Sequence, residues 1–369
     1  MSGHLRTEEF MVNMGPQHPS THGVCRLMLT LNGERIVKVE PVIGYLHRAI
    51  EKICENRTYT QCIPLMDRVE YVTSMSCNYL MSLAAERLAE IEVPERAEYI
   101  RVIMLELNRI ASHLIFYGTT AMDLGALTLF LYGLRERELI IDLFEMTCGQ
   151  RLTYNYNRVG CVSQDLPAEF VPKCREAMDT ISQKLVEYEG LLNENVIFET
   201  RTHGVGVLPA EMAIEYAVSG PVLRASGVDH DIRRDDPYSI YDRFDYEVPV
   251  QTAGDCYARY IQRLEEIKQS IRIVNQALDG LPEGDFRAKV NPITFKPPAG
   301  EVYARVENSR GELGLYVVSD GTNKPVRVKA RGGSYNQLQC LPHICEGVMV
   351  ADLVAIFATF DIILPEVDR

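Results

Sequence analysis

The segment from Pro94 to Gly118 constrains the fold more than any other part of this sequence, because it is apolar over most of a helical circumference. Pro94 and the glutamate after it supply a favourable helix start, and Gly118 predicts the helix end. The polar side chains of the segment share one arc of the helical projection: Glu98, Arg101, Glu106, Arg109 and His113. A helix of this kind is buried among other helices. We therefore predict a helix at the centre of a large core.

Other segments repeat the helical period. Residues 255–279 carry apolar side chains at i, i+3, i+4 and i+7 spacing, and a glycine and a proline follow as a stop. Residues 167–189 show the same pattern, and the segments around 67–90 and 122–147 extend it. Together these segments predict a long central helical bundle.

Both ends of the chain alternate between apolar and polar residues instead. Asn32-Gly33, which separates residues 24–31 from residues 35–40, is a strong hairpin signal and predicts a small β unit over residues 8–42. Towards the C-terminus the pattern predicts short strands and then a buried helix: residues 302–306, 313–319, 326–330 and 346–360.

The predicted fold class is α+β and mainly α. We expect an N-terminal β unit with a functional loop at residues 1–45 and a helical bundle core at residues 46–285. A C-terminal β region with a buried helix and tail is expected at residues 286–369.

Composition excludes several classes of function. The 369 residues carry a formal net charge of −13, so no basic field is available to meet nucleic-acid phosphates or an anionic membrane surface. The N-terminus is polar and lacks the apolar core of a secretory signal. The uncharged stretch at residues 124–134 is too short to span a bilayer. We expect a cytosolic chain or a peripheral part of a larger assembly.

The ten cysteines are scattered, and no C-x-x-C pair occurs. In a cytosolic protein such residues act as small buried hydrophobes rather than as a disulfide framework. A zinc or iron–sulfur site built from this chain alone is therefore not expected.

The densest functional signal is the loop sequence G-P-Q-H-P-S-T-H-G, which contains His18 and His22. Two histidines four residues apart could bind a metal on a helix face, but Pro19 and the flanking glycines disfavour a helix. The alternatives are a plain surface loop and a rigid loop that presents an imidazole to a ligand. Because histidine changes charge near neutral pH, such an imidazole could deliver a proton to a reduced acceptor.

Further signals are weaker. Residues 45–57 alternate in charge around Arg48, which is typical of a solvated face but also of buried ion pairs. Tyr71 ends a charged stretch before an apolar helix. A tyrosine at such a position either packs as an amphipathic residue or acts as an acid. Asp123 is a lone carboxylate in an apolar run, so it requires a partner or a raised pKa.

Taken together, these motifs resemble the 49-kDa subunit family of respiratory complex I, which belongs to the nickel–iron hydrogenase large-subunit superfamily. The resemblance runs in the family's order through the whole chain: G-P-Q-H-P-S-T-H-G, G-Y-L-H-R, E-N-R-T, P-E-R-A-E-Y-I-R-V-I-M-L-E-L-N-R-I-A-S-H-L, D-L-G-A, R-E-R-E, S-G-P-V-L-R-A-S-G and E-V-D-R. It implies a hydrogenase-like fold that has lost its metal site. Of the hydrogenase cysteine pairs, only Cys62 stands near the first position, and the stretch from Asp361 onward has no cysteine.

The resemblance implies a role in reducing quinone (menaquinone or ubiquinone) with electrons from a [4Fe–4S] cluster on a partner subunit. It implies that Tyr71 and His22 donate protons to the quinone and that Asp123 pairs with His22. The loss of the His22 proton would then free Asp123 to signal charge toward the membrane arm. Further residues are implied to lie at the quinone cavity or near the partner's cluster: His18, Arg48, Asp361 and Arg369. No metal ligand is implied on this chain.

The resemblance also implies partners and a location. The partners are the iron–sulfur subunit of complex I (its B subunit), the C and I subunits, and the H and A subunits of the membrane arm. The chain is then expected at the cytoplasmic face of the cell membrane, as a peripheral subunit of a proton-translocating NADH:quinone oxidoreductase.

One departure from the family pattern is informative. Many relatives carry a histidine near the cluster, in an A-R-M-H stretch, where this chain has Thr153 in Q-R-L-T. Threonine cannot couple a cluster potential to pH, so we predict a lower, pH-insensitive potential that suits a low-potential quinone such as menaquinone. Cys161 stands where the family usually has a glycine, and the sequence assigns it no function.

Two other classes of protein remain. A related subunit of a membrane-bound hydrogenase, or of a ferredoxin- or F420H2-driven complex, shares much of the pattern. Hydrogenases would show two C-x-x-C pairs, and the archaeal F420H2 relatives tend to lack the histidine at position 22. A purely structural scaffold would not need His22, Tyr71 and Asp123 together.

Overall fold

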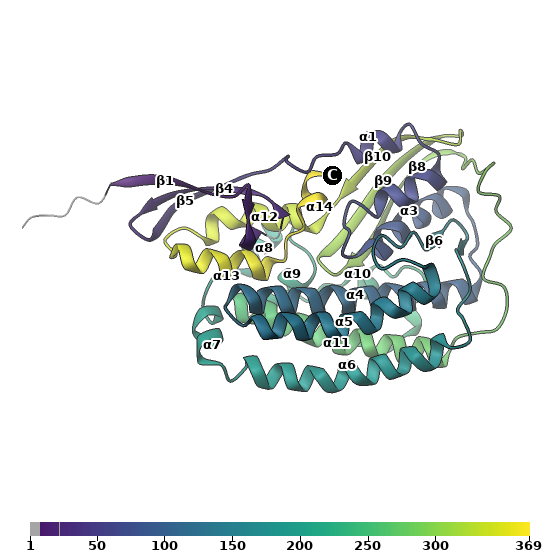
Figure 1. The fold of residues 1–369 in the computed structure, drawn as a ribbon. Coiled ribbons are helices and arrows are strands. Elements are labelled where there is room, and N and C mark those ends of the chain that lie inside the picture. Colours follow the sequence, from purple (N-terminus) through teal and green to yellow (C-terminus); the bar gives the residue numbers. More distant parts are fainter. Residues whose placement is uncertain (1–7, 22) are drawn as a thin grey trace, which may run out of the picture.

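The computed structural model describes residues 8–21 and 23–369. Long helices lie side by side in its lower half in Figure 1 and form the predicted bundle: α4 (Glu95–Asp123), α5 (Leu127–Cys148), α6 (Phe170–Leu192) and α11 (Cys256–Asp279). α4 contacts both α5 and α11, and α6 covers the outer side of α5 and α11. The helical segments predicted from the periodicity are confirmed.

The predicted helix end at Gly118 is wrong, because α4 continues to Asp123. Gly118 serves as a contact surface: a Cβ there would lie 3.1 Å from the Cα of Phe130 on α5. Gly133 on α5 faces α4 in the same way, since a Cβ would lie 2.7 Å from the carbonyl oxygen of Leu114. These glycines let the backbones of α4 and α5 approach closely. Gly118 therefore marks the place where the two helices meet, and not the end of α4.

An antiparallel sheet packs beside the bundle, in the order β10-β9-β8. Its strands confirm the predicted ones and are longer: β8 (Ala299–Asn308), β9 (Gly311–Asp320) and β10 (Pro325–Arg331). Helix α3 (Ser74–Ala89) lies against β8 and β9, and α2 (Tyr59–Met66) precedes it. The turn between α2 and α3 meets the sheet at the β8–β9 end, where Asn308 and Arg310 contact Glu70.

The N-terminal strands form a second antiparallel sheet that extends away from the bundle in Figure 1: β1 (Glu9–Met14), β4 (Arg26–Asn32) and β5 (Arg35–Val42). The predicted hairpin at Asn32-Gly33 is confirmed, with Gly33 at a φ of 64° in the turn. Along β4, buried and partly exposed residues alternate, so one face of the sheet packs inward.

The C-terminal region differs from the prediction. The last predicted helix begins at Val350 rather than at residue 346, and a helix over residues 333–344 was not predicted: α12 (Gly333–Ile344), α13 (Val350–Phe360) and α14 (Leu364–Asp368). The segment before α13 pairs with β5 instead, because the Ile36 amide donates to the Val348 carbonyl at 2.9 Å. This distant pairing delays the start of α13.

The remaining elements are short: β2 (Gln17–His18), η1 (Pro19–Thr21), β3 (Gly23–Val24), α1 (Ile50–Cys54), β6 (Asn157–Arg158), β7 (Cys161–Val162), α7 (Val196–Thr202), α8 (Ala210–Glu215), α9 (Pro221–Ala225), α10 (Ile232–Asp235) and η2 (Tyr241–Arg243).

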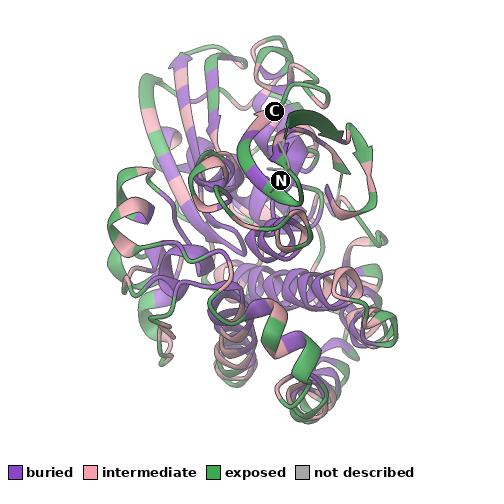
Figure 2. Cartoon of the chain, turned by 90° about the vertical axis from the view of Figure 1, so that its left-hand side faces the viewer, coloured by how far each residue is buried: buried purple, intermediate pink, exposed green. Residues whose placement is uncertain are grey.

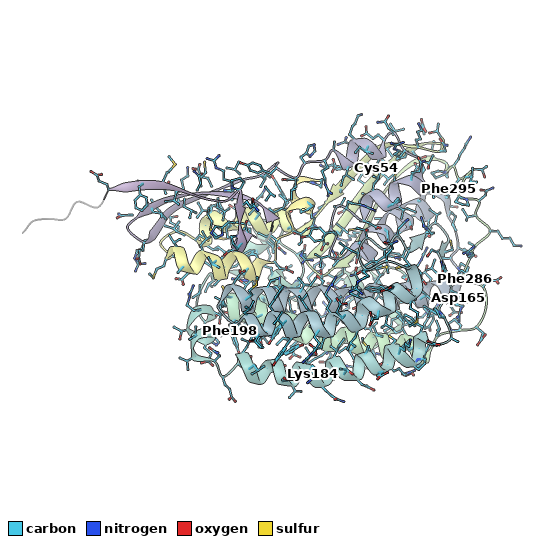
Figure 3. All side chains as sticks on the ribbon, in the orientation of Figure 1. Cys54, Asp165, Lys184, Phe198, Phe286 and Phe295 are labelled. Atoms are coloured by element: carbon cyan, nitrogen blue, oxygen red, sulfur yellow. The ribbon has the colours of Figure 1, made fainter. Side chains whose placement is uncertain are left out.

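The buried residues fall into two hydrophobic clusters. The larger one fills the bundle and the β8–β10 sheet, and the smaller one joins the inner face of the N-terminal sheet to α12 and α13. Figure 2 shows the buried residues gathered in the bundle and on the sheet, with exposed residues along the outer helices. Figure 3 places Phe198 at the α7 end of the bundle and Phe286 at the opposite end.

No helix within residues 8–21 and 23–369 is both long enough and apolar enough to cross a membrane. All ten cysteines lie in this described part and are free, and eight of them are buried, as predicted. The other two, Cys148 and Cys161, are partly exposed.

Candidate active site

Tyr71 lies on the turn between α2 and α3, and 36% of its surface is exposed. The preceding residue, Glu70, is fully buried. Partial burial raises the pKa of Tyr71; Arg310 opposes this rise, and the carboxylates of Glu70 and Asp361 add to it. The Tyr71 hydroxyl therefore stays protonated at neutral pH and can act as a proton donor that solvent or a ligand can reach.

Arg310, on the turn between β8 and β9, holds the Tyr71 segment from the inside. Its Nη1 donates to Glu70 Oε1 at 2.5 Å, and its Nη2 donates to Asp361 Oδ1 at 3.0 Å. Its Nε also donates to the backbone carbonyl of Asp361 at 2.8 Å. The amide of Asn308 donates a further hydrogen bond to Glu70. One buried guanidinium thus ties the turn with Tyr71 to the C-terminal segment.

Asp361 is the residue that ends α13, and it takes a left-handed conformation with φ of 58°. A second cation, Arg263 on α11, lies 3.9 Å from its Oδ2. The guanidinium of Arg263 stacks 4.0 Å from the ring centroid of Phe116, and burial lowers its pKa to about 10. Asp361 therefore sits between two guanidinium groups.

A further carboxylate, Glu366 on α14, belongs to the same cluster. It is buried and accepts hydrogen bonds from the backbone amides of Gly333 at 3.1 Å and Ser334 at 3.2 Å. Burial, and then the nearby Glu70, raise the pKa of Glu366 to about 7. The cluster of Glu70, Arg310, Asp361 and Glu366, which we call the carboxylate cluster, contains a group that titrates near neutral pH.

The histidine loop lies over the smaller hydrophobic cluster. The residues of η1 pack against α13, and Thr21 is buried there. His18 is partly exposed, and its Nδ1 accepts a hydrogen bond from the Ser20 amide at 3.2 Å. His22, the predicted proton donor, lies outside the described residues. Residues 17–21 are not α-helical, as Pro19 and the flanking glycines predicted.

Asp123 is the last residue of α4 and is partly buried. The next residue, Leu124, packs against both hydrophobic clusters. The carboxylate therefore stands where the bundle meets the region that carries the histidine loop.

The C-terminal residues tie the tail to the start of the chain. Asp368 accepts hydrogen bonds from the amides of Gly44 at 2.8 Å and Leu46 at 2.7 Å. Arg369 donates to the Ala330 carbonyl at 2.5 Å on β10. The tail is thus held by residues 44–46 and by β10, and the charged partner of Arg369 is Glu51 at 3.9 Å.

Arg48 is exposed and donates to the backbone carbonyl of Arg68, near the end of α2. Ala49 follows it in a left-handed conformation with φ of 55°. The exposed guanidinium is thereby held close to the α2–α3 turn, which also carries Tyr71.

A second set of buried charged side chains lies inside the bundle, around Glu106 on α4. Its carboxylate accepts from Arg233 at 3.1 Å, Arg109 at 3.2 Å, and the hydroxyls of Tyr241 and Ser270 at 2.7 Å each. Although burial opposes ionisation, these partners lower the pKa of Glu106 to about 2. The polar arc predicted on α4 therefore faces buried arginines and hydroxyls.

The same set continues at Glu266 on α11. Arg224 donates to Glu266 at 2.8 Å and to Glu307 at 2.9 Å, and His113 Nε2 lies 3.0 Å from Glu266. Burial is the largest influence on His113 and lowers its pKa to about 4. His113 is therefore neutral at physiological pH and acts as a hydrogen-bonded core residue.

Sequence reasoning missed Glu70, Arg310 and Glu366. Glu70 stands beside Tyr71 and Glu366 lies in the E-V-D-R motif, whereas no motif was singled out around Arg310. The available signal was a charged residue inside an apolar or turn segment, but that pattern is also typical of a solvated surface.

The loop that carries Thr153 borders a polar cavity of about 340 Å³, together with Arg68 and Arg158. The amide of Asn155, two residues further on, donates to Asp67 Oδ2 at 2.9 Å. Burial raises the pKa of Asp67 to about 7, against opposing hydrogen bonds and nearby arginines. A titratable carboxyl group therefore lies beside this loop.

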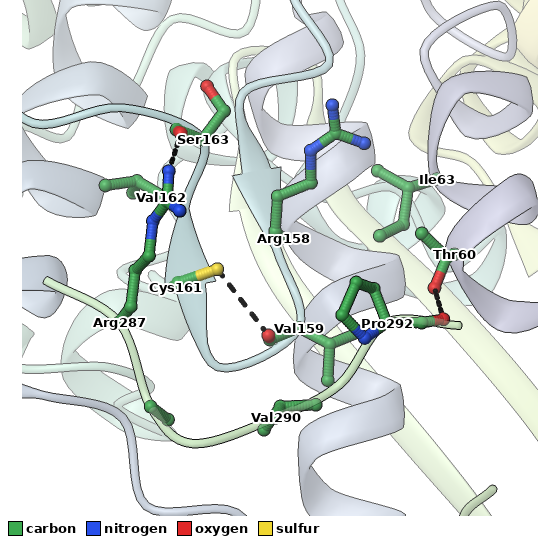
Figure 4. A pocket seen from close by; sticks show the side chains of 11 residues that line it. Thr60, Ile63, Arg158, Val159, Cys161, Val162, Ser163, Arg287, Val290 and Pro292 are labelled. Carbon is green, nitrogen blue, oxygen red and sulfur yellow. Dashed lines mark hydrogen bonds between the residues drawn. The ribbon is translucent and has the colours of Figure 1, made fainter. Parts of the chain in front are cut away.

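A neighbouring cavity of about 390 Å³ is lined by Arg158, Arg287 and Cys161 (Figure 4). Arg287 donates to the Ser163 carbonyl at 2.6 Å, and the Cys161 thiol faces the Val159 carbonyl at 3.7 Å. Burial raises the pKa of Cys161, so its thiol stays protonated and is a poor nucleophile.

In the part of the chain that the structure describes, no group of three or more histidine, cysteine, aspartate or glutamate side chains is placed to hold a metal ion. The chemistry that this arrangement offers is proton transfer from hydroxyl and carboxyl groups.

Comparisons with known proteins assign the family. The family described as "Respiratory-chain NADH dehydrogenase, 49 Kd subunit" matches residues 123–369. The chain is similar to proteins that are named as the D subunit of NADH-quinone oxidoreductase. The one from Desulforamulus reducens is 52% identical over 364 residues, covering 99% of each chain. The one from Dehalococcoides mccartyi (strain 195) is 55% identical over 366 residues, covering 99% of this chain and 100% of the relative. The one from Bacillus anthracis is 49% identical over 365 residues, with the same coverage.

These matches define the class of the protein as a subunit of an oxidoreductase complex. The chain belongs to the family of the 49-kDa subunit, also called the D subunit, of NADH-quinone oxidoreductase, respiratory complex I.

Proposed function

We propose that this chain forms the quinone-reducing site of a complex I. Electrons would reach the quinone from a [4Fe–4S] cluster on the iron–sulfur subunit. Residues of this chain would supply the two protons that convert quinone to quinol, in a reaction coupled to proton translocation. The quinone, menaquinone or ubiquinone, is the substrate, and this chain supplies no metal ligand.

The observation that carries the proposal is the position of Tyr71. Its ring is partly exposed, while the residue before it is anchored by Arg310 to Asp361. A donor for a quinone oxygen must be reachable by the substrate and fixed in direction. Tyr71 is reachable, its backbone is held in place through Glu70, and the raised pKa keeps its proton in place until a strong base forms on the quinone.

The second proton donor in the proposal is His22, with Asp123 as its partner. Asp123 supports this assignment by its place at the end of α4, next to a leucine that joins both hydrophobic clusters. His18, Arg48 and Arg369 are proposed to border the quinone cavity or the partner's cluster, together with Asp361.

The other proposed partners are the C and I subunits and the H and A subunits of the membrane arm. The proposal places the chain at the cytoplasmic face of the membrane as a peripheral subunit. Relatives named NADH-quinone oxidoreductase support NADH as the electron source.

The proposal predicts that Tyr71→Phe in the assembled complex lowers quinone reduction roughly 100- to 10,000-fold, the range that a lost general acid costs. Electron transfer from NADH to a soluble artificial acceptor that bypasses the quinone site is expected to stay unchanged. Tyr316→Phe is the control, because this tyrosine on β9 bonds to Glu301, a surface residue. Full quinone reduction by the Tyr71→Phe complex would overturn the proposal.

A second candidate is the homologous subunit of a ferredoxin- or F420H2-driven reductase, for which the same proton donors would serve. Assaying the purified complex with each electron donor separates the two candidates, since the donor binds to other subunits.

A further inference from the structure

We propose that the cavity lined by Arg158 and Arg287 binds a carboxylate side chain of the partner iron–sulfur subunit and helps to hold the two subunits together. The identity of the partner rests on the proposed function. The kind of side chain follows from the residues that line the cavity, which lie outside the set of proposed proton donors.

Two arginines line this cavity of about 390 Å³, which lies between α2, the β6–β7 hairpin and residues 287–292. Figure 4 shows both side chains running toward the side of the cavity where Ser163 lies. Arg287 donates to the Ser163 carbonyl at 2.6 Å. In the part of the chain that the structure describes, neither arginine forms an ion pair with a carboxylate, and the Arg158 side chain donates no hydrogen bond.

This lack of an acidic partner is specific to the cavity, because the chain carries a net charge of −13 and has many carboxylates. Partly exposed arginines elsewhere do have carboxylate partners: Arg96 with Asp165 at 2.9 Å, Arg201 with Asp352 at 3.5 Å and Arg305 with Asp236 at 2.8 Å. Burial lowers the pKa of Arg158, and the charge of Asp67 opposes this change only in part. A guanidinium that has lost some of its water is stabilised by a carboxylate, and a second chain can supply one.

The walls of the cavity are held in place by hydrogen bonds. The buried Arg101 donates from Nη2 to the carbonyls of Arg158 at 2.7 Å and Cys161 at 3.2 Å, one on each strand of the β6–β7 hairpin. The Gly160 carbonyl, in the hairpin turn, accepts from the Ala288 amide at 2.8 Å on the opposite wall. Because the cavity is preformed, a partner side chain binds without the cost of ordering it.

The rest of the lining is mainly apolar and includes Ile63, Val162 and Val290. Beside it, Ile293 follows the lining residue Pro292 and is 84% exposed, the highest value among the large apolar side chains of the described residues. A free inorganic anion would leave these apolar surfaces uncovered, whereas an aspartate or glutamate and its neighbours in a protein cover them. Arginine within an apolar surrounding is typical of protein–protein interfaces.

The neighbouring cavity indicates which partner this is. Arg158 also lines the polar cavity of about 340 Å³ beside Thr153, whose loop is proposed to lie near the partner's cluster. Arg68 lines the same polar cavity, and its carbonyl accepts a hydrogen bond from Arg48, another residue proposed for that region. The 390 Å³ cavity therefore continues the surface that the proposed function assigns to the iron–sulfur subunit.

The test is a cross-link made in the assembled complex. Arg287→Lys keeps the positive charge and introduces a primary amine, which a carbodiimide joins to a contacting carboxylate as an amide, with loss of water. We expect a link between position 287 and an aspartate or glutamate of the iron–sulfur subunit, identified by mass spectrometry of the linked peptides. Arg175→Lys is the matched control, because Arg175 on α6 contacts Asp279 at 2.6 Å and should give a link within this chain.

The site of the link decides the proposal. A link from position 287 only to this chain or to a different subunit would overturn it. The lack of any link at position 287 while the control reacts would also overturn it, and would leave a lipid headgroup or free phosphate as the ligand.

Removal of the charges tests whether the site holds the subunits together. The complex with both Arg158→Gln and Arg287→Gln should release the iron–sulfur subunit roughly 10- to 100-fold faster at a fixed salt concentration, because the loss of paired charges at an interface acts mainly on dissociation. Arg175→Gln should leave the rate unchanged, since its partner is on this chain. Unchanged release by the double variant would overturn the proposal. If the double variant does not assemble, the Arg287→Lys cross-link decides, because this variant retains the charge.

The docking site and the proposed function fail separately. A link to the iron–sulfur subunit in a protein whose Tyr71→Phe complex stays fully active would support the docking site and overturn the proposed function. A slow Tyr71→Phe complex without a link to the iron–sulfur subunit would overturn the docking site alone.

Discussion

At the level of single residues, the costly feature of this protein is its set of charged side chains with no access to water. Arg101, Arg224, Arg233 and Arg310 are all fully or almost fully buried. Each has carboxylate partners within hydrogen-bond distance, as buried guanidinium groups require. The removal of one carboxylate then leaves a buried positive charge uncompensated, and this cost is measurable.

Glu106→Gln tests that cost. Because Glu106 is the shared acceptor of Arg109 and Arg233, the variant should lower the free energy of unfolding by about 3–5 kcal/mol. The measurement is chemical unfolding of the purified chain followed by circular dichroism. Glu176→Gln, on the outer helix α6, is the control and should stay within about 0.5 kcal/mol of the unmodified chain. Equal stability of the two variants would contradict the role of Glu106.

The pairing of such residues explains why the sequence predicted only part of the site. Tyr71, Asp361 and Arg369 were singled out through motifs that the chain shares with its family. Glu70 and Arg310 are 240 positions apart, and nothing local in either segment indicates that they meet. A charged residue in a turn looks the same whether the fold later buries it or leaves it in water.

At the level of elements, the closeness of α4 and α5 depends on glycines. Gly133→Ala should lower the free energy of unfolding by about 1–3 kcal/mol, because the added methyl group meets the Leu114 carbonyl and forces the helix backbones apart. Thermal or chemical unfolding measures this change. Gly190→Ala is the matched control in α6, where a Cβ meets nothing within 4 Å. This control should gain about 0.5–1 kcal/mol from helix propensity, and a gain at both positions would contradict the close contact.

The helices also show what a periodic pattern of apolar residues can predict and what it cannot. The bundle helices were predicted because burial against neighbouring helices repeats every 3.6 residues and leaves its pattern in the sequence. Helix α12 was not predicted, because its two starting glycines and Pro342 resemble a loop. The start of α13 depends on pairing between residues 347–349 and β5, which lies more than 300 residues away.

At the level of the whole molecule, the candidate site is built from segments that are far apart in the chain. The α2–α3 turn, the β8–β9 turn and the C-terminal tail meet at Arg310, and the tail also binds residues 44–47. The division into units at residues 1–45, 46–285 and 286–369 remains our proposal. The contacts of Arg310 and of the tail mean that the site requires all three of these units.

In the assembled complex, the Thr153 loop is proposed to lie near the partner's cluster. Thr153 takes a left-handed conformation with φ of 55°, which histidine tolerates better than most residues. With threonine there, the cluster potential is expected to be independent of pH. Thr153→His should make it fall with rising pH by up to about 59 mV per pH unit, the limit for one proton per electron. Redox titrations of the complex at several pH values measure how the potential depends on pH in the unmodified complex and in Thr153→His.

A steep dependence on pH in the unmodified complex would contradict the expectation. Asp67, whose pKa burial raises to about 7, would then be the first candidate for its cause. Asp67→Asn would show whether this carboxyl group is responsible.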